Sequence, residues 1–423
     1  MNEDGTLMTV TEKVLHDRFH TSLYTDAKIF EAELARIFEN GWVWVAHDSE
    51  LPDTGSFKTT VIGRQPVIVT RTQAGTVNVM LNRCRHRAAA VCELETGKAA
   101  RFMCPYHGWT YGLDGRLIAV PYDEGYGENL RKEEFPLYPV RAESYAGLWF
   151  ATLNPDVEPL IDFLGEAAPW IDLFMKQSVD WPLEVIGSHK FEFDGNWKVP
   201  FENTTDGYHL PVVHNSYLRF MESETADRLG QVMRDESIYC RALGNGHSVG
   251  VFDTSAVDLS AAHSGETPSH YKELEAELLQ TMPPDVVARV LRGVGGVGFN
   301  LNLFPNIALS GAFFRELRPI AVDKTEVRHV ALGMKGGPAS ANRARMRIHE
   351  QFQGPAGLGS SDDREAWERV ARGAKSGRDA WVMLNRGLNR EHLIDGRLVS
   401  HATDETGMRE LYVRWKKVMA DAY

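Results

Sequence analysis

Two short motifs pair a cysteine with a histidine, Cys84-Arg85-His86 and Cys104-Pro105-Tyr106-His107. A [2Fe–2S] cluster of the Rieske type needs such a set, because two thiolates bind one iron and two imidazoles bind the other. A structural zinc site also uses cysteine and histidine at short spacings. Zinc fingers rarely leave a single residue between two ligands, so the motifs favour the cluster. Its predicted ligands are Cys84, His86, Cys104 and His107.

A second set of metal-binding residue types lies between Asn203 and His214. Asn203, Asp206 and His209 recur every three residues, which predicts that they share one face of a helix. Pro211 disfavours a helical residue before it, so the helix should end near His209 and bend. The bend would return His214 to the same point in space. Two imidazoles and one carboxylate form the facial triad of non-haem Fe(II) oxygenases, which leaves coordination positions open for dioxygen.

The residues around the two Cys/His motifs have the pattern of short strands separated by Gly, Asn and Asp. Strands are predicted at 42–46, 57–62, 66–70, 77–81, 99–103 and 148–153. Together they predict a small all-β domain over residues 41–157, with both motifs at loop tips.

Residues 1–40 and 158–423 mix strand and helix patterns without βαβ alternation, which predicts a larger α+β catalytic domain with an antiparallel sheet. Further strands are predicted at 184–193, 297–303, 307–309 and 326–332. Helices are predicted at 29–38, 160–174, 341–353, 364–373 and 408–418. The polar stretch 259–283 predicts a loop or lid. The expected fold class of the whole chain is therefore α+β, with helices carrying the mononuclear iron site.

The composition is that of a soluble protein with more than one domain, since the chain has 423 residues of which 43% are hydrophobic. A net charge of −12 argues against binding to nucleic acid. The chain has four cysteines, so once the cluster takes two no disulfide framework is left, and a reducing compartment fits. Cys92 and Cys240 are expected to be small buried side chains. No signal peptide and no membrane-spanning segment is recognised, which predicts a cytoplasmic protein.

The run from Gly293 to Gly298 matches the G-x-G-x-x-G pattern of dinucleotide-binding loops. A helix-like segment precedes it and an extended segment follows, which reverses the order that such a loop requires. No nucleotide site is expected, so electrons from a nicotinamide would have to arrive through another protein.

Both motifs resemble those of one known family. The run from Cys104 to Tyr111, Cys-Pro-Tyr-His-Gly-Trp-Thr-Tyr, resembles the second cluster loop of Rieske oxygenases. The family pattern Asp-x-Tyr-His-x4-His falls on Asp206, Tyr208, His209 and His214. With the order of the domains and the length, the chain resembles the large (α) subunit of a Rieske non-haem iron aromatic ring-hydroxylating oxygenase.

The resemblance implies a role for each residue that matches. His209 and His214 would bind the mononuclear Fe(II). The third ligand in the family is an aspartate after a Gly-Pro-Ala-Gly turn, which assigns Asp363, with Asp362 as the alternative. Asp206 and Asn203 are the expected catalytic residues. Asp206 would bridge to His86 or His107 of a neighbouring subunit in a homotrimer, with or without a small β subunit (α3β3).

The resemblance also implies partners. The terminal oxygenase would use O2 and electrons relayed from NAD(P)H by a flavin reductase or ferredoxin. Five basic side chains crowd the cluster loops and offer a surface for an acidic electron donor, although they also fit solvated loop charges. They are Arg83, Arg85, Arg87, Lys98 and Arg101.

The substrate pocket should be apolar and next to the iron. Its candidates are Phe201, Asn203, Val213, Leu303, Phe304 and Phe352. Core packing explains Phe352 equally well and explains the other phenylalanines better. Residues 62–67 and 120–126 look most like the benzoate, toluate, anthranilate and salicylate branch, which suggests an aromatic carboxylate. The cation that would bind this carboxylate stays open among Arg219, Arg292, Arg315 and His247.

Four interpretations of the function stay open on the sequence. The first is cis-dihydroxylation of an aromatic ring in aromatic hydrocarbon catabolism. The second keeps both metals but performs monohydroxylation or demethylation. The third is an electron-transfer protein in which His209 and His214 are structural. The fourth is a zinc-stabilised binding protein, which would be colourless and without acid-labile sulfide.

Overall fold

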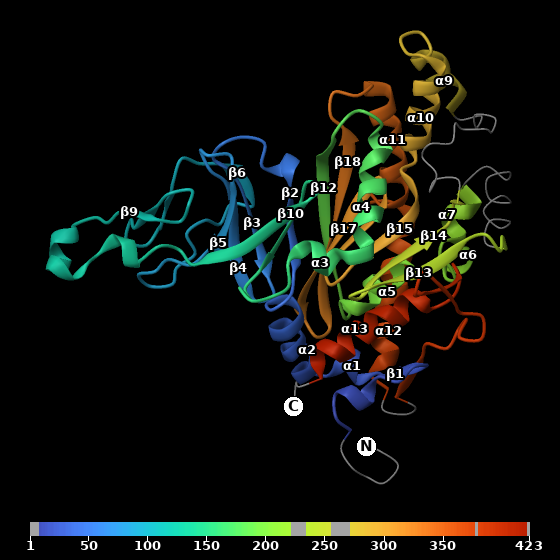
Figure 1. The fold of residues 1–423 in the computed structure, drawn as a ribbon, viewed down its shortest axis with the longest axis horizontal. Helices are drawn as coiled ribbons and strands as arrows, with labels where there is room; N and C mark the ends of the chain where they lie inside the picture. The colour runs from blue at the N-terminus through green and yellow to red at the C-terminus, as the bar shows by residue number, and fades with distance from the viewer. Residues whose placement is uncertain (1–7, 221–233, 255–270, 377–379, 421–423) are drawn as a thin grey trace. The chain divides into compact units, whose positions relative to one another are not determined.

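The computed structural model describes residues 8–220, 234–254, 271–376 and 380–420 (Figure 1). The chain divides into two compact units. One comprises Leu34–Phe163, and the other comprises Met1–Glu33 together with Leu164–Tyr423. Both Cys/His motifs lie in the first unit, and the stretch from Asn203 to His214 lies in the second.

The unit Leu34–Phe163 contains an antiparallel sheet and a small second sheet. In spatial order the strands of the first are β2 (Val43–His47), β11 (Leu148–Thr152), β10 (Pro139–Tyr145), β5 (Val77–Leu81), β4 (Gln65–Arg71), β3 (Ser56–Ile62) and β6 (Thr96–Lys98). The second sheet consists of β7 (Phe102–Met103), β8 (Thr110–Tyr111) and β9 (Leu117–Ala119). β2 is buried along its whole length, as its run of apolar residues predicts. The prediction of a small all-β domain is confirmed.

The strand predicted at 99–103 is wrong over most of its length. The backbone amide of Ala99 donates to the carbonyl of Gly55, 2.9 Å away, beside the β3–β6 pair. The chain then crosses to the small sheet, where only Phe102–Met103 pairs with β8. This crossing brings the chain directly to Cys104.

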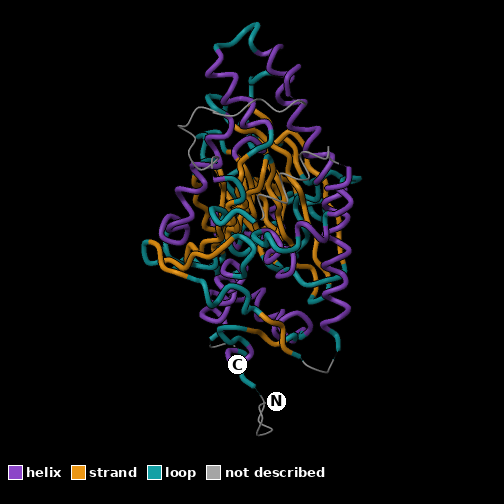
Figure 2. Tube along the Cα trace, turned by 90° about the vertical axis from the view of Figure 1, so that its right-hand side faces the viewer, coloured by secondary structure: helices purple, strands orange, loops and turns teal. Residues whose placement is uncertain are grey.

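The larger unit is organised around a nine-stranded antiparallel sheet, seen as the central orange strands of Figure 2. In spatial order the strands are β12 (Leu183–Phe193), β18 (Lys324–Met334), β17 (Phe313–Ala321), β16 (Ile307–Gly311), β15 (Val297–Leu303), β14 (His247–Val251), β13 (Tyr239–Gly244), β21 (Arg397–His401) and β20 (His392–Ile394). A two-stranded sheet joins β1 (Arg18–His20) to β19 (Trp381–Met383). The predicted strands at 184–193, 297–303, 307–309 and 326–332 all lie in the large sheet.

Helices accompany this sheet, and in Figure 1 α10 and α11 run side by side. They are α1 (Ser22–Thr25), α2 (Ala27–Glu33), α4 (Ala168–Met175), α5 (Lys198–Thr204), α6 (Leu210–Val213), α7 (Asn215–Phe220), α9 (Lys272–Leu278), α10 (Pro284–Val294), α11 (Ala339–Phe352), α12 (Leu358–Ala374) and α13 (Thr406–Met419). Another helix, α3 (Leu160–Leu164), lies at the boundary between the two units. A π-helical segment, Leu34–Phe38, continues α2. Among the described residues, no helix is both long and apolar enough to cross a membrane. The predicted α+β class is confirmed.

The structure corrects the prediction of a helix at 160–174 and part of the prediction of a loop at 259–283. The segment 160–174 is not one helix: α3 ends at Leu164, Gly165 adopts a positive φ of 47°, and α4 restarts with a proline in its first turn. Within the polar stretch 259–283, residues 272–278 form α9, whereas residues 259–270 lie outside the described part of the chain. The order around Gly293–Gly298 is as predicted, since α10 precedes it and β15 follows.

Candidate metal centres and the adjoining cavity

Three side chains of the larger unit converge on one point. His209, His214 and Asp363 each offer a ligand atom within 4.8 Å of the other two. Nε2 of His209 lies 3.2 Å from Nε2 of His214. Oδ1 of Asp363 lies 3.3 Å from Nε2 of His214 and 3.6 Å from Nε2 of His209. Two imidazoles and one carboxylate in this arrangement match the facial triad that binds Fe(II).

The local structure that gathers them differs from the sequence prediction. α5 ends at Thr204, and α6 begins after His209, so one helix does not carry Asn203, Asp206 and His209. Pro211 lies in the first turn of α6, where a missing N–H costs nothing, so it starts a helix and does not end one. The chain turns at Gly207, whose amide donates to the carbonyl of Ala402 at 3.1 Å.

The sequence offered two adjacent aspartates, and the structure separates them. Asp363, in the first half of α12, is 2% exposed and faces the histidines. Asp362 instead accepts a hydrogen bond from Ser216 Oγ at 2.5 Å, and it stays 4.0 Å from Nδ1 of His214. Only Asp363 therefore joins the cluster.

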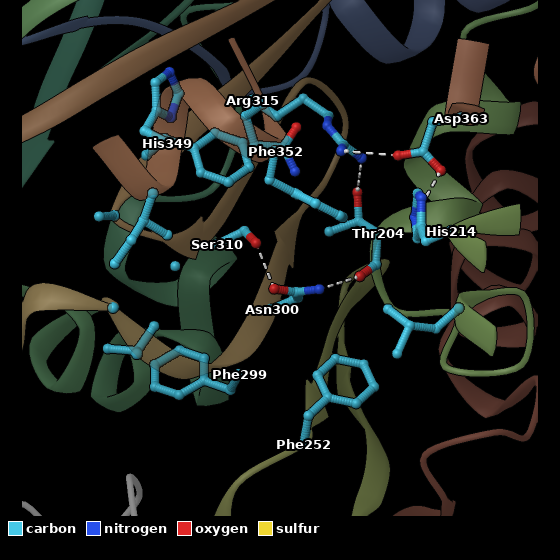
Figure 3. Close-up of a pocket in the computed structure, with 18 of the residues that line it drawn as sticks. Thr204, His214, Phe252, Phe299, Asn300, Ser310, Arg315, His349, Phe352 and Asp363 are labelled. Carbon is cyan, nitrogen blue, oxygen red and sulfur yellow. Dashed lines mark hydrogen bonds and ion pairs between the residues drawn. The ribbon is translucent and has the colours of Figure 1, made fainter. Parts of the chain in front are cut away.

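Other polar side chains hold the carboxylate of Asp363. Asn203 Nδ2 donates to Asp363 Oδ1 at 3.2 Å, and its Oδ1 accepts from Arg315 Nη1 at 3.4 Å. Arg315 Nη2 lies 3.7 Å from Asp363 Oδ2 (Figure 3). Burial favours the neutral acid form of Asp363, yet the hydrogen bond and charge of His214 and the charge of Arg315 hold the pKa of this carboxyl below its usual value. The carboxylate is thus kept in the ionised form that a metal needs.

Asp206 lies beside the three metal ligands but is not one of them. Its Oδ2 is 3.3 Å from Nδ1 of His209, the ring nitrogen that faces away from His214. Burial disfavours the charged form of His209, but the carboxylates of Asp206 and Asp363 outweigh this effect and raise the pKa of the imidazole. A carboxylate on the outer nitrogen of a metal-binding histidine fixes its tautomer and its orientation.

A cavity of about 350 Å³ opens onto this cluster. Figure 3 shows the aromatic rings of Phe252, Phe299 and Phe352 around it, with His214 and Asp363 at one side. Of the predicted pocket residues, Asn203 and Phe352 line the cavity, and the Phe352 ring lies 4.9 Å from the ring of His214.

The other predicted pocket residues lie elsewhere. Phe201 and Phe304 are buried, and their ring centroids are 6.2 Å apart, in contact with Trp197. Leu303 is buried in β15, and Val213 on α6 does not line the cavity. Phe201 packs in the core, whereas Asn203, on the same helix α5, turns toward the metal ligand Asp363.

Sequence reasoning missed several cavity residues, among them Thr204, Asn300, Ser310, Arg345 and His349. A polar residue in a buried strand could have indicated one of them. Asn300 on β15 donates to the carbonyl of Thr204 at 2.8 Å and accepts from Ser310 Oγ at 2.5 Å. Nothing in the local pattern of α11 distinguishes Arg345 and His349 from its other polar residues.

The two Cys/His loops of the smaller unit share one hydrogen-bond pattern. The carbonyl of Cys84 accepts from the amide of Ala88, and the carbonyl of Cys104 accepts from the amide of Gly108, both at 3.0 Å. The amides of both cysteines donate at 2.8 Å to a carbonyl five residues on. Both loops need a positive φ at the same position, 62° at Ala88 and 73° at Gly108. The loops therefore present their ligands in equivalent ways.

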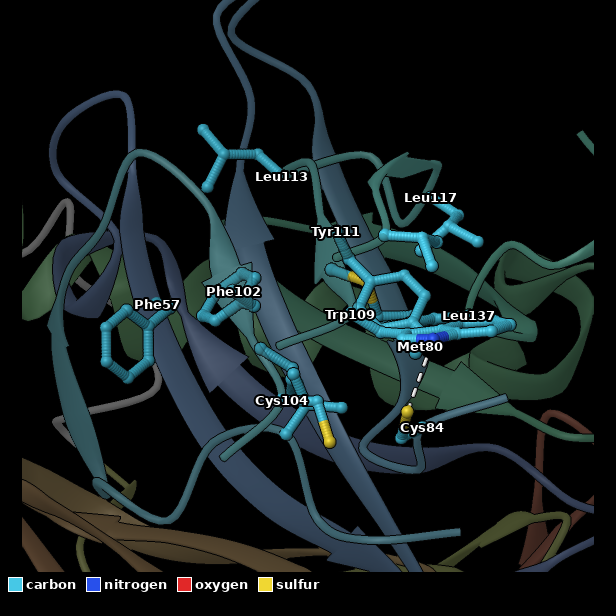
Figure 4. Close-up of a cluster of buried hydrophobic side chains, with 13 residues drawn as sticks. Phe57, Met80, Cys84, Phe102, Cys104, Trp109, Tyr111, Leu113, Leu117 and Leu137 are labelled. Carbon is cyan, nitrogen blue, oxygen red and sulfur yellow. Dashed lines mark hydrogen bonds between the residues drawn. The ribbon is translucent and has the colours of Figure 1, made fainter. Parts of the chain in front are cut away.

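The side chains of these loops fit a [2Fe–2S] cluster. Cys84 and Cys104 are free and buried, and Figure 4 shows both sulfur atoms at the same end of a hydrophobic cluster. The rings of His86 and His107 lie 4.6 Å apart. Nδ1 of His86 is buried and has no hydrogen-bond partner among the described residues, which leaves its lone pair for a metal. Burial and the neighbouring His107 lower the pKa of His86, so this ligand is neutral.

Comparisons with known proteins agree with both centres. Residues 41–136 match the model of the Rieske [2Fe-2S] domain, and residues 181–421 match that of the ring hydroxylating alpha subunit (catalytic domain). The large subunit of anthranilate 1,2-dioxygenase from Acinetobacter baylyi is 33% identical over 392 residues, which is 88% of this chain and 80% of that protein. Toluate 1,2-dioxygenase subunit alpha from Pseudomonas putida is 33% identical over 393 residues, or 90% and 83% of the two chains.

Solved structures agree with these family assignments. Naphthalene 1,2-dioxygenase with indole in its active site superposes with a TM-score of 0.82 at 29% identity, over 100% of this chain and 96% of that one. A quaternary ammonium Rieske monooxygenase has a TM-score of 0.69 at 17% identity, over 96% and 99%, and shares the fold. A Rieske [2Fe–2S] cluster and a mononuclear iron are the cofactors of this chain. The chain belongs to the aromatic ring-hydroxylating dioxygenases of the Rieske non-haem iron family, as a large (α) subunit in the branch of the anthranilate, toluate and halobenzoate enzymes.

Proposed function

We propose that the chain is the terminal oxygenase component that cis-dihydroxylates the ring of an aromatic carboxylate. In this proposal His209, His214 and Asp363 bind the mononuclear iron, and the two Cys/His loops bind the cluster. The observation that carries it is the convergence of the three ligand atoms within 4.8 Å beside a cavity of about 350 Å³. A cavity of that size accepts a one- or two-ring aromatic molecule.

When bound, the iron supplies dioxygen activation and the cluster supplies single electrons. The residues of the chain position these groups. Asn203 and Arg315 hold the Asp363 carboxylate, and Asp206 holds the outer nitrogen of His209. The phenylalanines of the cavity wall exclude water and orient an apolar ring.

Two observations support the proposed substrate class: the substrates in the names of similar proteins, and the charged side chains of the cavity. Anthranilate, toluate and 2-halobenzoate, which name three of the similar dioxygenases, are all aromatic carboxylates. A buried carboxylate needs a cationic or multiply donating partner. Two arginines, Arg315 and Arg345, line the cavity and can supply such charge.

We also propose the partners that this chemistry needs. Some relatives are named as the large oxygenase component of a multi-component system. A flavin reductase or ferredoxin would relay electrons from NAD(P)H, and it would dock on exposed basic side chains of the cluster loops. Arg83, Arg87 and Arg101 are all exposed.

The assembly that we propose is a homotrimer, with or without a small β subunit. Asp206 would meet His107 or His86 of a neighbouring copy, in a ring with threefold symmetry. His107 is exposed in the chain and thus accessible to another copy. The domains that we propose are 41–157 for the cluster and 1–40 with 158–423 for the mononuclear iron.

Product analysis tests the proposed reaction. The reduced holoenzyme is incubated with a panel of aromatic acids and neutral arenes under ¹⁸O-labelled dioxygen. We expect a cis-diol of an aromatic acid that carries two labelled oxygen atoms. A phenol with one labelled atom, or a demethylated product, would replace the proposal with a monooxygenase.

A further inference from the structure

Helix α11 turns two buried polar side chains toward the cavity. Arg345 is 1% exposed and His349 is 6% exposed, and both line the cavity. They are four residues apart, so they lie on the same face of the helix, one turn from each other. Neither residue belongs to the group of metal ligands that His209, His214 and Asp363 form.

The side chain of His349 has no hydrogen-bond partner in the described part of the chain. Nδ1 of its ring is buried and unpaired among the described residues, and no described group donates to or accepts from the other nitrogen. The neighbours of the ring are the rings of His189, at 6.0 Å, and Phe313, at 5.5 Å. Burial and the neighbouring His189 lower the pKa of His349 to about 4, so at neutral pH the ring is an uncharged imidazole with one N–H donor. A buried polar group without a partner costs stability, so such a group in a cavity indicates a ligand.

Arg345 is a buried cation without an acidic partner among the described residues. Its guanidinium donates to the carbonyls of Gly293 and Leu332 and to the side-chain oxygen of Gln177, and all three acceptors are neutral. Burial alone lowers the pKa of Arg345 to about 10, with no compensating charge. A guanidinium has five N–H donors, so two remain for a further acceptor.

The other cations that the sequence suggested are placed differently. The charge of Arg315 is offset by Asp363, 3.7 Å away. Arg219 is exposed on α7, and Arg292 lines a separate pocket. His247 accepts a hydrogen bond from the amide of Phe304 at 3.0 Å and does not line the cavity.

We infer that Arg345 and His349 form the subsite that binds the carboxylate of the aromatic substrate. His349 donates a hydrogen bond to a carboxylate oxygen, and Arg345 supplies the opposite charge. Figure 3 shows His349 and Asp363 on opposite sides of the Phe352 ring, so a bound ring would span the cavity from the carboxylate subsite to the metal ligands. This inference rests on the proposed function and names the residues that select its substrate.

Equilibrium binding tests the subsite without turnover. The probes are 4-fluorobenzoate and 4-fluorotoluene, which differ in the carboxylate and are titrated against the holoenzyme by ¹⁹F NMR. We expect the wild-type protein to bind the carboxylate at least about tenfold more tightly. His349→Leu should remove most of this preference and leave the affinity for 4-fluorotoluene within about threefold, whereas His349→Gln should retain part of it.

The neighbouring Ile348→Ala is the matched control, because it enlarges the cavity wall without removing a polar group. It should change the affinities for both probes alike. Arg345→Gln tests the charge but also removes a tether to α10, so His349→Leu is the deciding variant. An unchanged preference in His349→Leu, or no preference in the wild-type protein, would overturn the subsite. Product analysis separates the two proposals. A cis-diol of an aromatic acid together with an unchanged carboxylate preference in His349→Leu contradicts the subsite alone, and a phenol contradicts the proposed reaction alone.

Discussion

Lys198 Nζ lies 2.6 Å from Glu33 Oε1, and neither side chain has any exposed surface. The indole nitrogens of Trp197 and Trp415 also donate to the carboxylate of Glu33, at 2.9 and 2.6 Å. This buried pair joins α2 to α5 and α13, and α5 ends one residue after Asn203. The position of Asn203 beside Asp363 therefore depends on a contact with a helix near the N-terminus.

Replacing Lys198 with methionine should destabilise the larger unit strongly. The variant leaves the charge of Glu33 buried without its partner, which costs about 3–5 kcal/mol of unfolding free energy. Urea denaturation of the holoenzyme measures the change. Lys324→Met is the control, because its pair with Glu192 is largely exposed and should contribute little. Equal effects of the two substitutions would contradict the role of the buried pair.

A second buried carboxylate should make stability depend on pH. Glu202 accepts hydrogen bonds from Tyr24 and Tyr412, yet burial raises the pKa of its carboxyl to about 7. The folded state thus binds a proton that the unfolded state releases near its ordinary value of 4.5. The contribution of Glu202 to stability is full below pH 4.5 and is lost as the pH rises through 7.

The matched variant is Glu202→Gln, which keeps the size and cannot ionise. We expect the Tm of the wild-type protein to fall relative to that of the variant between pH 5 and pH 8, as measured by differential scanning fluorimetry. A constant difference across this range would show that Glu202 does not titrate there.

Tyr111 should raise the reduction potential of the [2Fe–2S] cluster. Its Oη lies 3.3 Å from Sγ of Cys84, and a hydroxyl that donates to a ligand sulfur stabilises the reduced, more negative cluster. Tyr111→Phe should lower the reduction potential by roughly 40 mV, the equivalent of about 1 kcal/mol for one electron. A spectroelectrochemical titration measures it. Tyr106→Phe is the control, because its ring stacks on His107 and its hydroxyl makes no such bond. Equal potentials in the wild-type protein and Tyr111→Phe would refute the assignment.

Asp206 should matter for turnover and not for metal binding. Its carboxylate lies beside His209 but outside the group of metal ligands. In the proposed trimer its charge would link the two centres, and an amide cannot supply that charge. Asp206→Asn should keep the iron content and the cluster spectrum while product formation stops. The exposed Asp285→Asn should behave like the wild-type protein. Retained turnover in Asp206→Asn would refute the bridge.

The types of metal ligand could be predicted from the sequence, together with five of the seven strands of the smaller unit's main sheet and four of the nine strands of the large sheet. His209, His214 and Asp363 were predicted together because their residue types and the turn before Asp363 match one family pattern, and the structure brings their side chains into one cluster. The strand at 297–303 was predicted with the bounds of β15, since its apolar residues alternate with Gly298, Asn300 and Asn302 at the period of a strand.

The path of the chain between Asn203 and His214 could not be predicted. It depends on the contact of Gly207 with Ala402, nearly two hundred residues away, which no local pattern contains. The residues that line the pocket could not be predicted for the same reason. Whether Phe201 or Asn203 faces the cavity is decided by the packing of Phe201 against Phe304.

The central claim is that two separate iron centres share this chain, one of them bound by Asp363. Iron and acid-labile sulfide contents of the wild-type protein, Asp363→Ala and the adjacent control Asp362→Ala test it most directly. We predict about three iron atoms and two sulfides per chain in the wild-type protein and the control, and about two of each in Asp363→Ala. Retention of all three iron atoms by Asp363→Ala would contradict the account.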